Sequence, residues 1–402
     1  MKISALVFVS LFLVSLFFSF LSLTSMTVIA AVGSDDSLSE VNSYESNFDQ
    51  GGAASGGAAL GQNAGNRIVM SMLSADVADS GINKVIYGID NRTDVYASTN
   101  AKFKLWAQST AAQISREKMV SGNAGTYLIK TGSLKEEMAA NGMNFCSSER
   151  FISQPAAANC SGFLVGPDLL VTAGHCVQNL NECKQMLWVF DYKVKDAAHV
   201  NDKISVPTSS VYSCKELIGQ ALNNGDEEDF AFIRLDRAVT GRNPLSFRKS
   251  GTIGVNEQVV VIGHPSGLPT KITNGAFVRR SDHPAFFVAN SDTYGGNSGS
   301  AVFNVRTGEV EGILVRGDQD FEYSSTDGCY VSKKCGEDEC RGEDITKITV
   351  IKELMKMLYY KLIFFSKLSI KIQNKKYLCL KNLSIFFNKI YSYFISTKIT
   401  IQ

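Results

Sequence analysis

The sequence predicts an all-β fold, built as an antiparallel sandwich or barrel. Short runs of β-branched and aromatic residues recur between turn signals, and helical periodicity is scarce. A chain of 402 residues that is 45% hydrophobic and 20% charged can also bury a large core. Strands separated by short turns are typical of antiparallel sheets, whereas β-α units would place helical segments between the strands.

The predicted strands follow one another along the globular part of the chain. A first hairpin runs from Phe163–Val165 through the turn at 166–168 into Leu169–Ala173. The turn residues Gly, Pro and Asp favour a tight reversal there. Further strands are predicted over 230–235, 258–262, 276–279, 285–289, 301–305 and 310–315.

The N-terminal segment has the pattern of a secretory signal. After Lys2 there is no charged residue until Asp35, residues 5–23 are mostly apolar, and small residues follow at 30–31. This pattern predicts a cleaved signal peptide over residues 1–31. The alternative is an uncleaved anchor, since the uncharged stretch is long enough to span a bilayer. Both place the rest of the chain in an oxidising compartment, and we expect a secreted protein, extracellular or periplasmic.

Two further segments are predicted to lie outside the folded domain. Residues 32–84 open on an acidic stretch and a Gly- and Ala-rich run at 51–59, which indicates a low-complexity pro-region or linker. Residues 351–402 form a Lys-, Ile- and Phe-rich tail, and from 356 onward it contains no Gly, Ala, Val, Pro, Arg, Asp or Glu. We expect this tail to have no fold of its own. The alternative is a basic amphipathic helix at a membrane surface. The folded domain is therefore predicted over residues 85–350.

The charge and the cysteine content limit the kinds of partner and ligand that we expect this chain to bind. Residues 1–355 carry 31 Lys and Arg against 39 Asp and Glu, a formal net charge of −8, which argues against nucleic acid. Eight of the nine cysteines lie between Cys146 and Cys340, enough for four disulfides. Neither a Cys-x-x-Cys pair nor a His-Glu-x-x-His string occurs, so no metal and no cofactor are predicted.

Three short strings supply the parts of a nucleophilic acyl-transfer site. They are Ala-Gly-His-Cys around His175, the strand that opens at Asp229, and Gly-Gly-Asn-Ser-Gly-Ser around Ser298. A serine hydroxyl needs an adjacent base, and a carboxylate fixes the tautomer of an imidazole base. The glycines beside the serine favour an oxyanion hole made by the backbone N–H groups of Gly296 and Ser298.

Chain order and context narrow the choice of acid and of enzyme class. The order His, Asp, Ser along the chain excludes the α/β-hydrolases, in which the serine comes first. Ser300 also stands where the Gly-x-Ser-x-Gly motif of those enzymes needs Gly. Acids 226–228 are alternatives for the carboxylate, but only Asp229 directly precedes the apolar strand. The other histidines are expected to be ordinary surface residues: His199, His264 and His283.

These strings resemble the chymotrypsin-like (trypsin-like) serine endopeptidases, and most of all their bacterial-type branch, which includes the glutamyl endopeptidases. The resemblance covers about residues 85–350, and the stretch from Val85 to Val95 is similar to the mature start of that branch. It implies a double β-barrel with the active site between the barrels. It also implies a disulfide between Cys160 and Cys176, which bracket the histidine.

The resemblance also implies a substrate pocket. Asp292, six residues before Ser298, matches a position that selects Lys or Arg in trypsins, and Thr293 follows it. Leu314 stands where the glutamyl branch has a substrate-recognising histidine, and Arg316 lies nearby as a possible substitute.

The sequence therefore predicts a serine-type endopeptidase that hydrolyses peptide bonds in proteins through an acyl-enzyme. The predicted catalytic residues are His175, Asp229 and Ser298. We expect protein or peptide substrates, no membrane contact beyond the signal segment, and a monomer. The alternative is a catalytically silent binding protein with the same fold.

Overall fold

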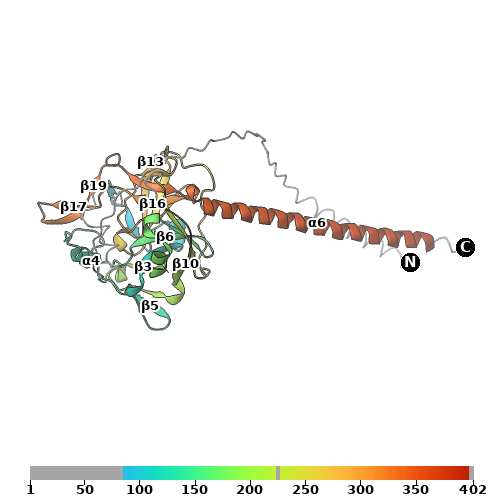
Figure 1. Cartoon of the computed structure of the whole chain (residues 1–402), viewed down its shortest axis with the longest axis horizontal. Coiled ribbons are helices and arrows are strands. Elements are labelled where there is room, and N and C mark those ends of the chain that lie inside the picture. The colour runs from blue at the N-terminus through green and yellow to red at the C-terminus, as the bar shows by residue number, and fades with distance from the viewer. Residues whose placement is uncertain (1–84, 223–226, 398–402) are drawn as a thin grey trace, which may run out of the picture. The chain divides into compact units, whose positions relative to one another are not determined.

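The computed structural model describes residues 85–222 and 227–397, and its strands form two antiparallel barrels (Figure 1). The predicted all-β double barrel is confirmed. All barrel strands lie between Thr110 and Lys347, inside the domain predicted over 85–350. The predicted signal peptide, 1–31, and the predicted pro-region or linker, 32–84, lie outside the described residues.

The first barrel closes because β10 pairs with both β8 and β11. Its six strands are, in order of pairing, β10 (Val211–Leu222), β11 (Asp229–Leu235), β7 (Leu169–Thr172), β6 (Cys160–Gly166), β3 (Thr110–Ser115) and β8 (Met186–Phe190).

The second barrel closes in the same way, because β12 pairs with both β15 and β13. Its strands are, in order of pairing, β12 (Gln258–Gly263), β15 (Ala301–Asn304), β16 (Val310–Arg316), β20 (Glu343–Lys347), β14 (Phe286–Ala289) and β13 (Lys271–Arg280). Strand β2 (Arg92–Asp94) adds to the outer edge of β13.

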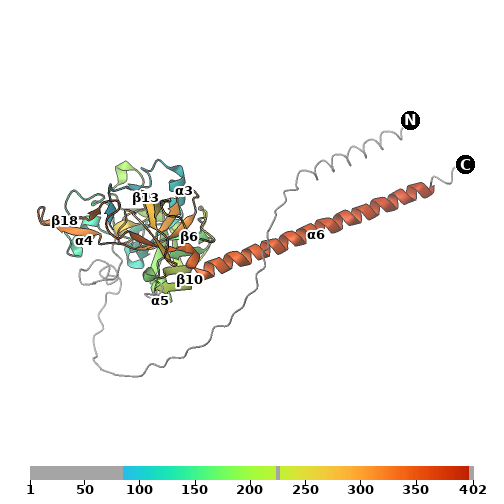
Figure 2. The same cartoon turned by 90° about the horizontal axis from the view of Figure 1, so that it is seen from above.

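Short elements surround the barrels (Figure 2). The helices are α3 (Ala101–Ala107), α4 (Leu134–Ala140) and α5 (Leu180–Gln185), and the small strands are β1 (Ile86–Tyr87), β4 (Met119–Ser121), β5 (Thr126–Ile129), β9 (Ser205–Pro207), β17 (Phe321–Ser324), β18 (Cys329–Ser332) and β19 (Lys334–Cys335). The 3-10 turns are η1 (Arg116–Lys118), η2 (Gly174–Cys176), η3 (Ala197–His199), η4 (Thr208–Ser210), η5 (Pro265–Gly267) and η6 (Ile348–Val350). Helix α4 begins with a capping box, in which the Ser133 hydroxyl and the Glu136 carboxylate each bind the other residue's backbone N–H.

One apolar cluster joins the two barrels. It contains Trp188 and Phe232 from the first barrel and Val260 and Phe303 from the second, all fully buried. A separate cluster around Phe287 fills the second barrel. Removing such large side chains from water is the main driving force for folding, so the shared cluster holds the two barrels together.

Four disulfides use all eight cysteines between Cys146 and Cys340. The pairs are Cys146–Cys329, Cys160–Cys176, Cys183–Cys214 and Cys335–Cys340. The structure thus contains the disulfide around the histidine that the resemblance implies.

The C-terminal segment, for which we expect no fold of its own, is helical in the structure. It forms one helix, α6 (Lys352–Thr397), which follows Ile351. Leu354 is buried in the core cluster, and Leu358 packs against it. Many described side chains beyond Leu358 are exposed: Tyr359, Tyr360, Tyr377, Leu378, Leu380, Leu383, Ile385, Phe386 and Phe387. Whether the tail packs into a fold of its own stays a prediction.

Among the described residues, no helix combines the length and the apolar character needed to cross a membrane.

Candidate active site

His175 lies on the 3-10 turn η2 that follows strand β7. Its side chain is 7% exposed, and its Nδ1 lies 2.7 Å from Oδ2 of Asp229. The carboxylate can only accept a hydrogen bond when it is ionised, so Nδ1 carries the proton and donates. This leaves the other ring nitrogen, Nε2, as the basic atom.

Asp229 opens strand β11, which pairs with β7, so the strand register brings the carboxylate next to His175. Its other oxygen, Oδ1, accepts the backbone N–H groups of Gly174 at 2.6 Å and His175 at 3.1 Å. Burial acts to raise the pKa of Asp229, but the adjacent His175 and these hydrogen bonds outweigh it and hold that pKa below its ordinary value. The carboxylate is therefore ionised at neutral pH.

The two described acids just before Asp229, Glu227 and Glu228, make no hydrogen bond to His175. Glu227 is part-exposed, and its backbone carbonyl accepts a bond from Arg316. Glu228 is part-exposed, and Asp226 lies outside the described residues. The structure thus brings Asp229, of the four candidates, into contact with the histidine.

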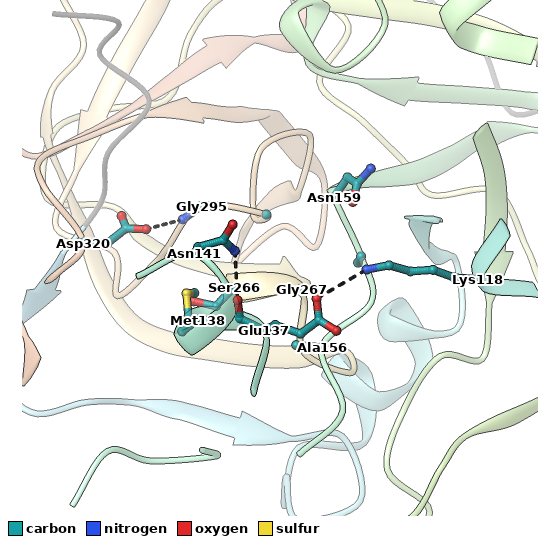
Figure 3. Close-up of a pocket in the computed structure, with 12 residues that line it drawn as sticks. Lys118, Glu137, Met138, Asn141, Ala156, Asn159, Ser266, Gly267, Gly295 and Asp320 are labelled. Carbon is teal, nitrogen blue, oxygen red and sulfur yellow. Dashed lines mark hydrogen bonds and ion pairs between the residues drawn. The ribbon is translucent and has the colours of Figure 1, made fainter. Parts of the chain in front are cut away.

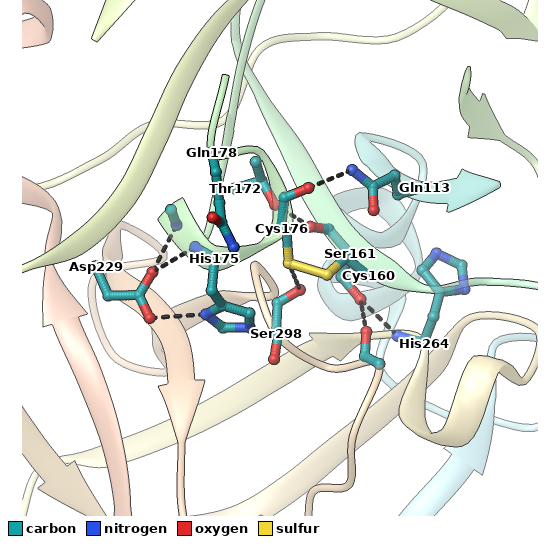
Figure 4. The surroundings of a disulfide bond; sticks show 12 residues. Gln113, Cys160, Ser161, Thr172, His175, Cys176, Gln178, Asp229, His264 and Ser298 are labelled. Atoms are coloured by element: carbon teal, nitrogen blue, oxygen red, sulfur yellow. Dashed lines mark hydrogen bonds and ion pairs between the residues drawn. A yellow bond between two sulfur atoms is a disulfide. The ribbon is translucent and has the colours of Figure 1, made fainter. Parts of the chain in front are cut away.

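Ser298 lies in the loop between β14 and β15 of the second barrel and is fully buried. Figure 4 shows the imidazole of His175 between Asp229 and Ser298, with the Nε2 edge toward the serine. Nε2 is buried and has no hydrogen-bond partner among the described residues. A nitrogen held in this way has its lone pair available for a proton.

Two glycines shape the serine loop. Gly296 and Gly299 both have φ of +88°, a conformation that side chains other than glycine rarely adopt. A Cβ on Gly296 would also come within 2.6 Å of the carbonyl oxygen of His264. The loop therefore requires glycine at both positions around the serine.

The Cys160–Cys176 disulfide joins strand β6 to the turn that carries His175 (Figure 4). Gln113 of strand β3 supports the same turn, because its Nε2 donates to the Cys176 carbonyl at 2.9 Å. The two cysteine sulfurs and the imidazole of His175 lie close enough to hold a metal ion. With both sulfurs in a disulfide, however, no thiolate ligand is present.

The predicted pocket residue Asp292 contacts the first residues of the domain. Its two oxygens accept the N–H groups of Tyr87 and Asn91, each at 2.7 Å, and its side chain is buried. Burial raises the pKa of Asp292 to about 7, against the opposing effect of these two hydrogen bonds. The Thr293 hydroxyl donates to Glu343 at 2.7 Å.

The side chains of Leu314 and Arg316 both contact other parts of the protein. The Leu314 side chain is fully buried in the core of the second barrel. Arg316 binds Asp344 at 3.0 Å and the carbonyl of Glu227 at 3.0 Å. The part of these four residues in substrate recognition stays a prediction.

A cavity that the sequence did not predict borders the serine loop at Gly295 and Gly296. Figure 3 shows side chains of α4, among them Met138, facing Gly295, Ser266 and Asn159 across this space. Asp320 fixes its wall, because the carboxylate accepts the N–H of Gly295 at 2.8 Å. The complete lining is Lys118, Glu137, Met138, Asn141, Ala156, Ala158, Asn159, Ser266, Gly267, Gly295, Gly296 and Asp320.

The expectation that His264 is a surface residue was wrong. Its ring is fully buried, Nδ1 lies 3.1 Å from the Leu268 carbonyl, and the ring stacks on Tyr192. Burial lowers the pKa of His264 to about 3, so the ring is neutral. His199 is exposed and His283 is part-exposed, as expected.

Comparison with known proteins matches residues 160–313 to the family model described as a trypsin-like peptidase domain. No curated protein matches the sequence.

The solved structures that match this chain share little sequence with it. A Glu endopeptidase in complex with MPD is 17% identical with a TM-score of 0.37, and the match covers 69% of this chain and 99% of that one. A serine endoprotease from Yersinia pestis is 14% identical with a TM-score of 0.38, covering 65% and 66%. The VesB protease of Vibrio cholerae is 12% identical with a TM-score of 0.39, covering 66% of each. Likenesses this weak bear on none of the residue assignments.

Proposed function

We propose that His175, Asp229 and Ser298 form a catalytic triad, since this chain is a serine-type endopeptidase with a trypsin-like peptidase domain. The observation that carries the proposal is the 2.7 Å contact between His175 Nδ1 and Asp229, with Nε2 turned toward Ser298. The substrates are proteins or peptides.

The chemistry follows from this geometry. Nε2 of His175 takes the proton of the Ser298 hydroxyl as the oxygen attacks the carbonyl carbon of the scissile bond. The imidazolium that results is stabilised by the carboxylate of Asp229. It then gives its proton to the departing amine, which leaves an acyl-enzyme on Ser298. Water, activated by the same nitrogen, hydrolyses this ester and restores the serine.

Backbone N–H groups stabilise the negative oxygen of the tetrahedral intermediate. The proposed donors are the N–H groups of Gly296 and Ser298, in the loop that both flanking glycines shape. A single donor of this kind contributes about 3–4 kcal/mol to transition-state stabilisation.

The cavity beside Gly295 and Gly296 fits the leaving-group side of the substrate. It borders the serine loop, and its lining includes none of the four residues predicted for the substrate pocket, Asp292, Thr293, Leu314 and Arg316. Met138 and Ala156 give it apolar walls. We assign it to a side chain that follows the scissile bond.

Secretion is part of the proposal. The apolar segment before Ala31 is followed by a domain whose eight cysteines are all paired in four disulfides. Stable disulfides form in oxidising compartments, so we assign the protein to the extracellular space or the periplasm.

The test is active-site labelling of the full chain, expressed through an oxidising secretory pathway. We expect a fluorophosphonate probe to label the wild type at Ser298 and to leave Ser298→Ala unlabelled, because all nucleophilic chemistry is placed on that hydroxyl. Removing a triad member typically lowers turnover by about 10⁶-fold. Ser300→Ala is the matched control and should still be labelled, since its hydroxyl contacts Asn297 at 3.2 Å.

The same experiment distinguishes the proposed enzyme from the alternative, a catalytically silent binding protein. Such a protein would bind peptides without reacting with the probe. An unlabelled wild type whose four disulfides are intact would overturn the triad, and equal labelling of Ser298→Ala would overturn the choice of nucleophile.

A further inference from the structure

Ser161 is a buried residue of strand β6 whose polar atoms are all hydrogen-bonded, two of them to the serine loop (Figure 4). Its N–H donates to the carbonyl of Ser298 at 2.8 Å, and its hydroxyl donates to the carbonyl of Gly296 at 2.8 Å. The hydroxyl oxygen also accepts the N–H of His264 at 2.9 Å, and the Ser161 carbonyl accepts the hydroxyl of Thr172 at 2.7 Å.

The two carbonyls that Ser161 binds belong to the same two residues whose N–H groups are proposed as the oxyanion hole. Within one residue, only φ and ψ separate the N–H direction from the C=O direction. A carbonyl that is held in place therefore also restricts where the N–H of that residue points. Ser161 does this for both Gly296 and Ser298.

Gly296 needs such an external anchor more than other residues do. Glycine populates several backbone conformations at little cost, so a glycine loop does not by itself keep one peptide orientation. At Gly296, with φ of +88°, the Ser161 hydroxyl is the side-chain group that holds the carbonyl.

We propose that Ser161 is a positioning residue for the oxyanion hole. It acts across the two barrels, because β6 belongs to the first barrel and the serine loop to the second. Through its hydroxyl and its N–H it holds the Gly296 and Ser298 peptides so that their N–H groups face the developing oxyanion. This inference rests on the proposed function.

A hydroxyl that only satisfies a buried carbonyl would behave differently on removal. In that case its loss would lower the free energy of unfolding, as the loss of any buried hydrogen bond does, and would leave the rate of acylation unchanged. A positioning role predicts a slower acylation step in a protein that is still folded.

The test compares Ser161→Ala with Ser210→Ala in the full chain. Ser210 is a matched control because it is also buried, at the end of the turn η4 that precedes β10, and its hydroxyl donates at 2.7 Å, but to Asp191. The burst of nitrophenol from p-nitrophenyl acetate measures acylation of Ser298. We expect the maximal acylation rate of Ser161→Ala to fall about tenfold, less than the 10²–10³ lost with a whole oxyanion donor. Binding of the ester should be unchanged, and Ser210→Ala should react like the wild type.

The pH profile separates a misplaced oxyanion hole from a damaged base. The contact between His175 and Asp229 does not involve Ser161, so the pH at half-maximal acylation should be the same in Ser161→Ala and wild type, with only the plateau lowered. A shifted midpoint would overturn the assignment, because the hydroxyl would then act through the imidazole.

A second pair of variants keeps the test decisive if Ser161→Ala does not fold. Ser161→Thr and Ser161→Val have the same size and differ in the hydroxyl. We expect the Thr variant to acylate several times faster than the Val variant, and equal rates in this pair would overturn the proposal. A wild type that fails to acylate would overturn both this inference and the proposed function, whereas a reactive wild type with an equally reactive Ser161→Ala would overturn this inference alone.

Discussion

Asp229→Asn should inactivate the enzyme while leaving it folded, because the two carboxylate oxygens have different partners. Oδ1 accepts two backbone N–H groups, from Gly174 at 2.6 Å and His175 at 3.1 Å, whereas Oδ2 contacts the imidazole at 2.7 Å. An asparagine that keeps the two backbone bonds must place its amide oxygen at the Oδ1 position. Its NH₂ group then lies against Nδ1 of His175.

An NH₂ group at that position reverses the tautomer of the imidazole. Nδ1 has to accept from the amide, so the proton moves to Nε2, the nitrogen that faces Ser298. A protonated Nε2 cannot take the serine proton. We expect turnover to fall by about 10⁴, which corresponds to about 5 kcal/mol of transition-state stabilisation. The free energy of unfolding should fall by about 2 kcal/mol, because both backbone bonds remain in neutral form.

The assay is the acylation burst together with thermal melting of the same preparation. Asp236→Asn is the matched control, since this exposed carboxylate accepts the Ser213 N–H at 3.2 Å just beyond the other end of β11. It should retain wild-type acylation. Acylation by folded Asp229→Asn within about tenfold of wild type would refute the tautomer argument.

Three further changes test the surroundings of the proposed triad. Replacing both Cys160 and Cys176 by Ser should lower the free energy of unfolding by about 3 kcal/mol for a ring of 16 residues; an unchanged urea midpoint would contradict this. Gly299→Ala should strongly destabilise the fold, because its Cβ would overlap the carbonyl oxygen of Ser161 at a φ of +88°; a melting temperature equal to wild type would argue against this loop conformation. His264 has a pKa of about 3 when folded and about 6.5 when unfolded, so acidification through this window protonates only the unfolded chain and lowers stability by about 1.4 kcal/mol per pH unit. Urea titrations of His264→Phe should lack this component, and an identical pH slope in variant and wild type would refute it.

The sequence predicts those parts of the site that depend on local patterns. The strand that opens at Asp229 is uninterrupted and apolar, and the glycines around Ser298 leave few alternatives for the loop. The antiparallel pairing of β7 with β11 then brings His175 and Asp229 together.

Features that depend on distant contacts were not predicted. Ser161 and Gly296 are 135 positions apart, and no local signal marks a serine that will bind a carbonyl in the other barrel. Strand β20 was missed because Glu343 and Asp344 look like surface residues, although both are buried. Asp344 accepts bonds from Arg316 and Arg341, which offset the cost of burying its charge. His264 was misplaced for a similar reason, since its Pro-flanked loop turns inward.

The Cys146–Cys329 disulfide gives a protease of this kind tolerance to its own activity. The bond joins positions 183 residues apart, and His175, Asp229 and Ser298 all lie between them. A cut at any single peptide bond within this span opens a covalent ring without releasing a fragment. A nicked molecule therefore keeps the three proposed triad residues in one covalently linked molecule. It migrates as one species without reductant, and it separates into two only when the disulfides are reduced.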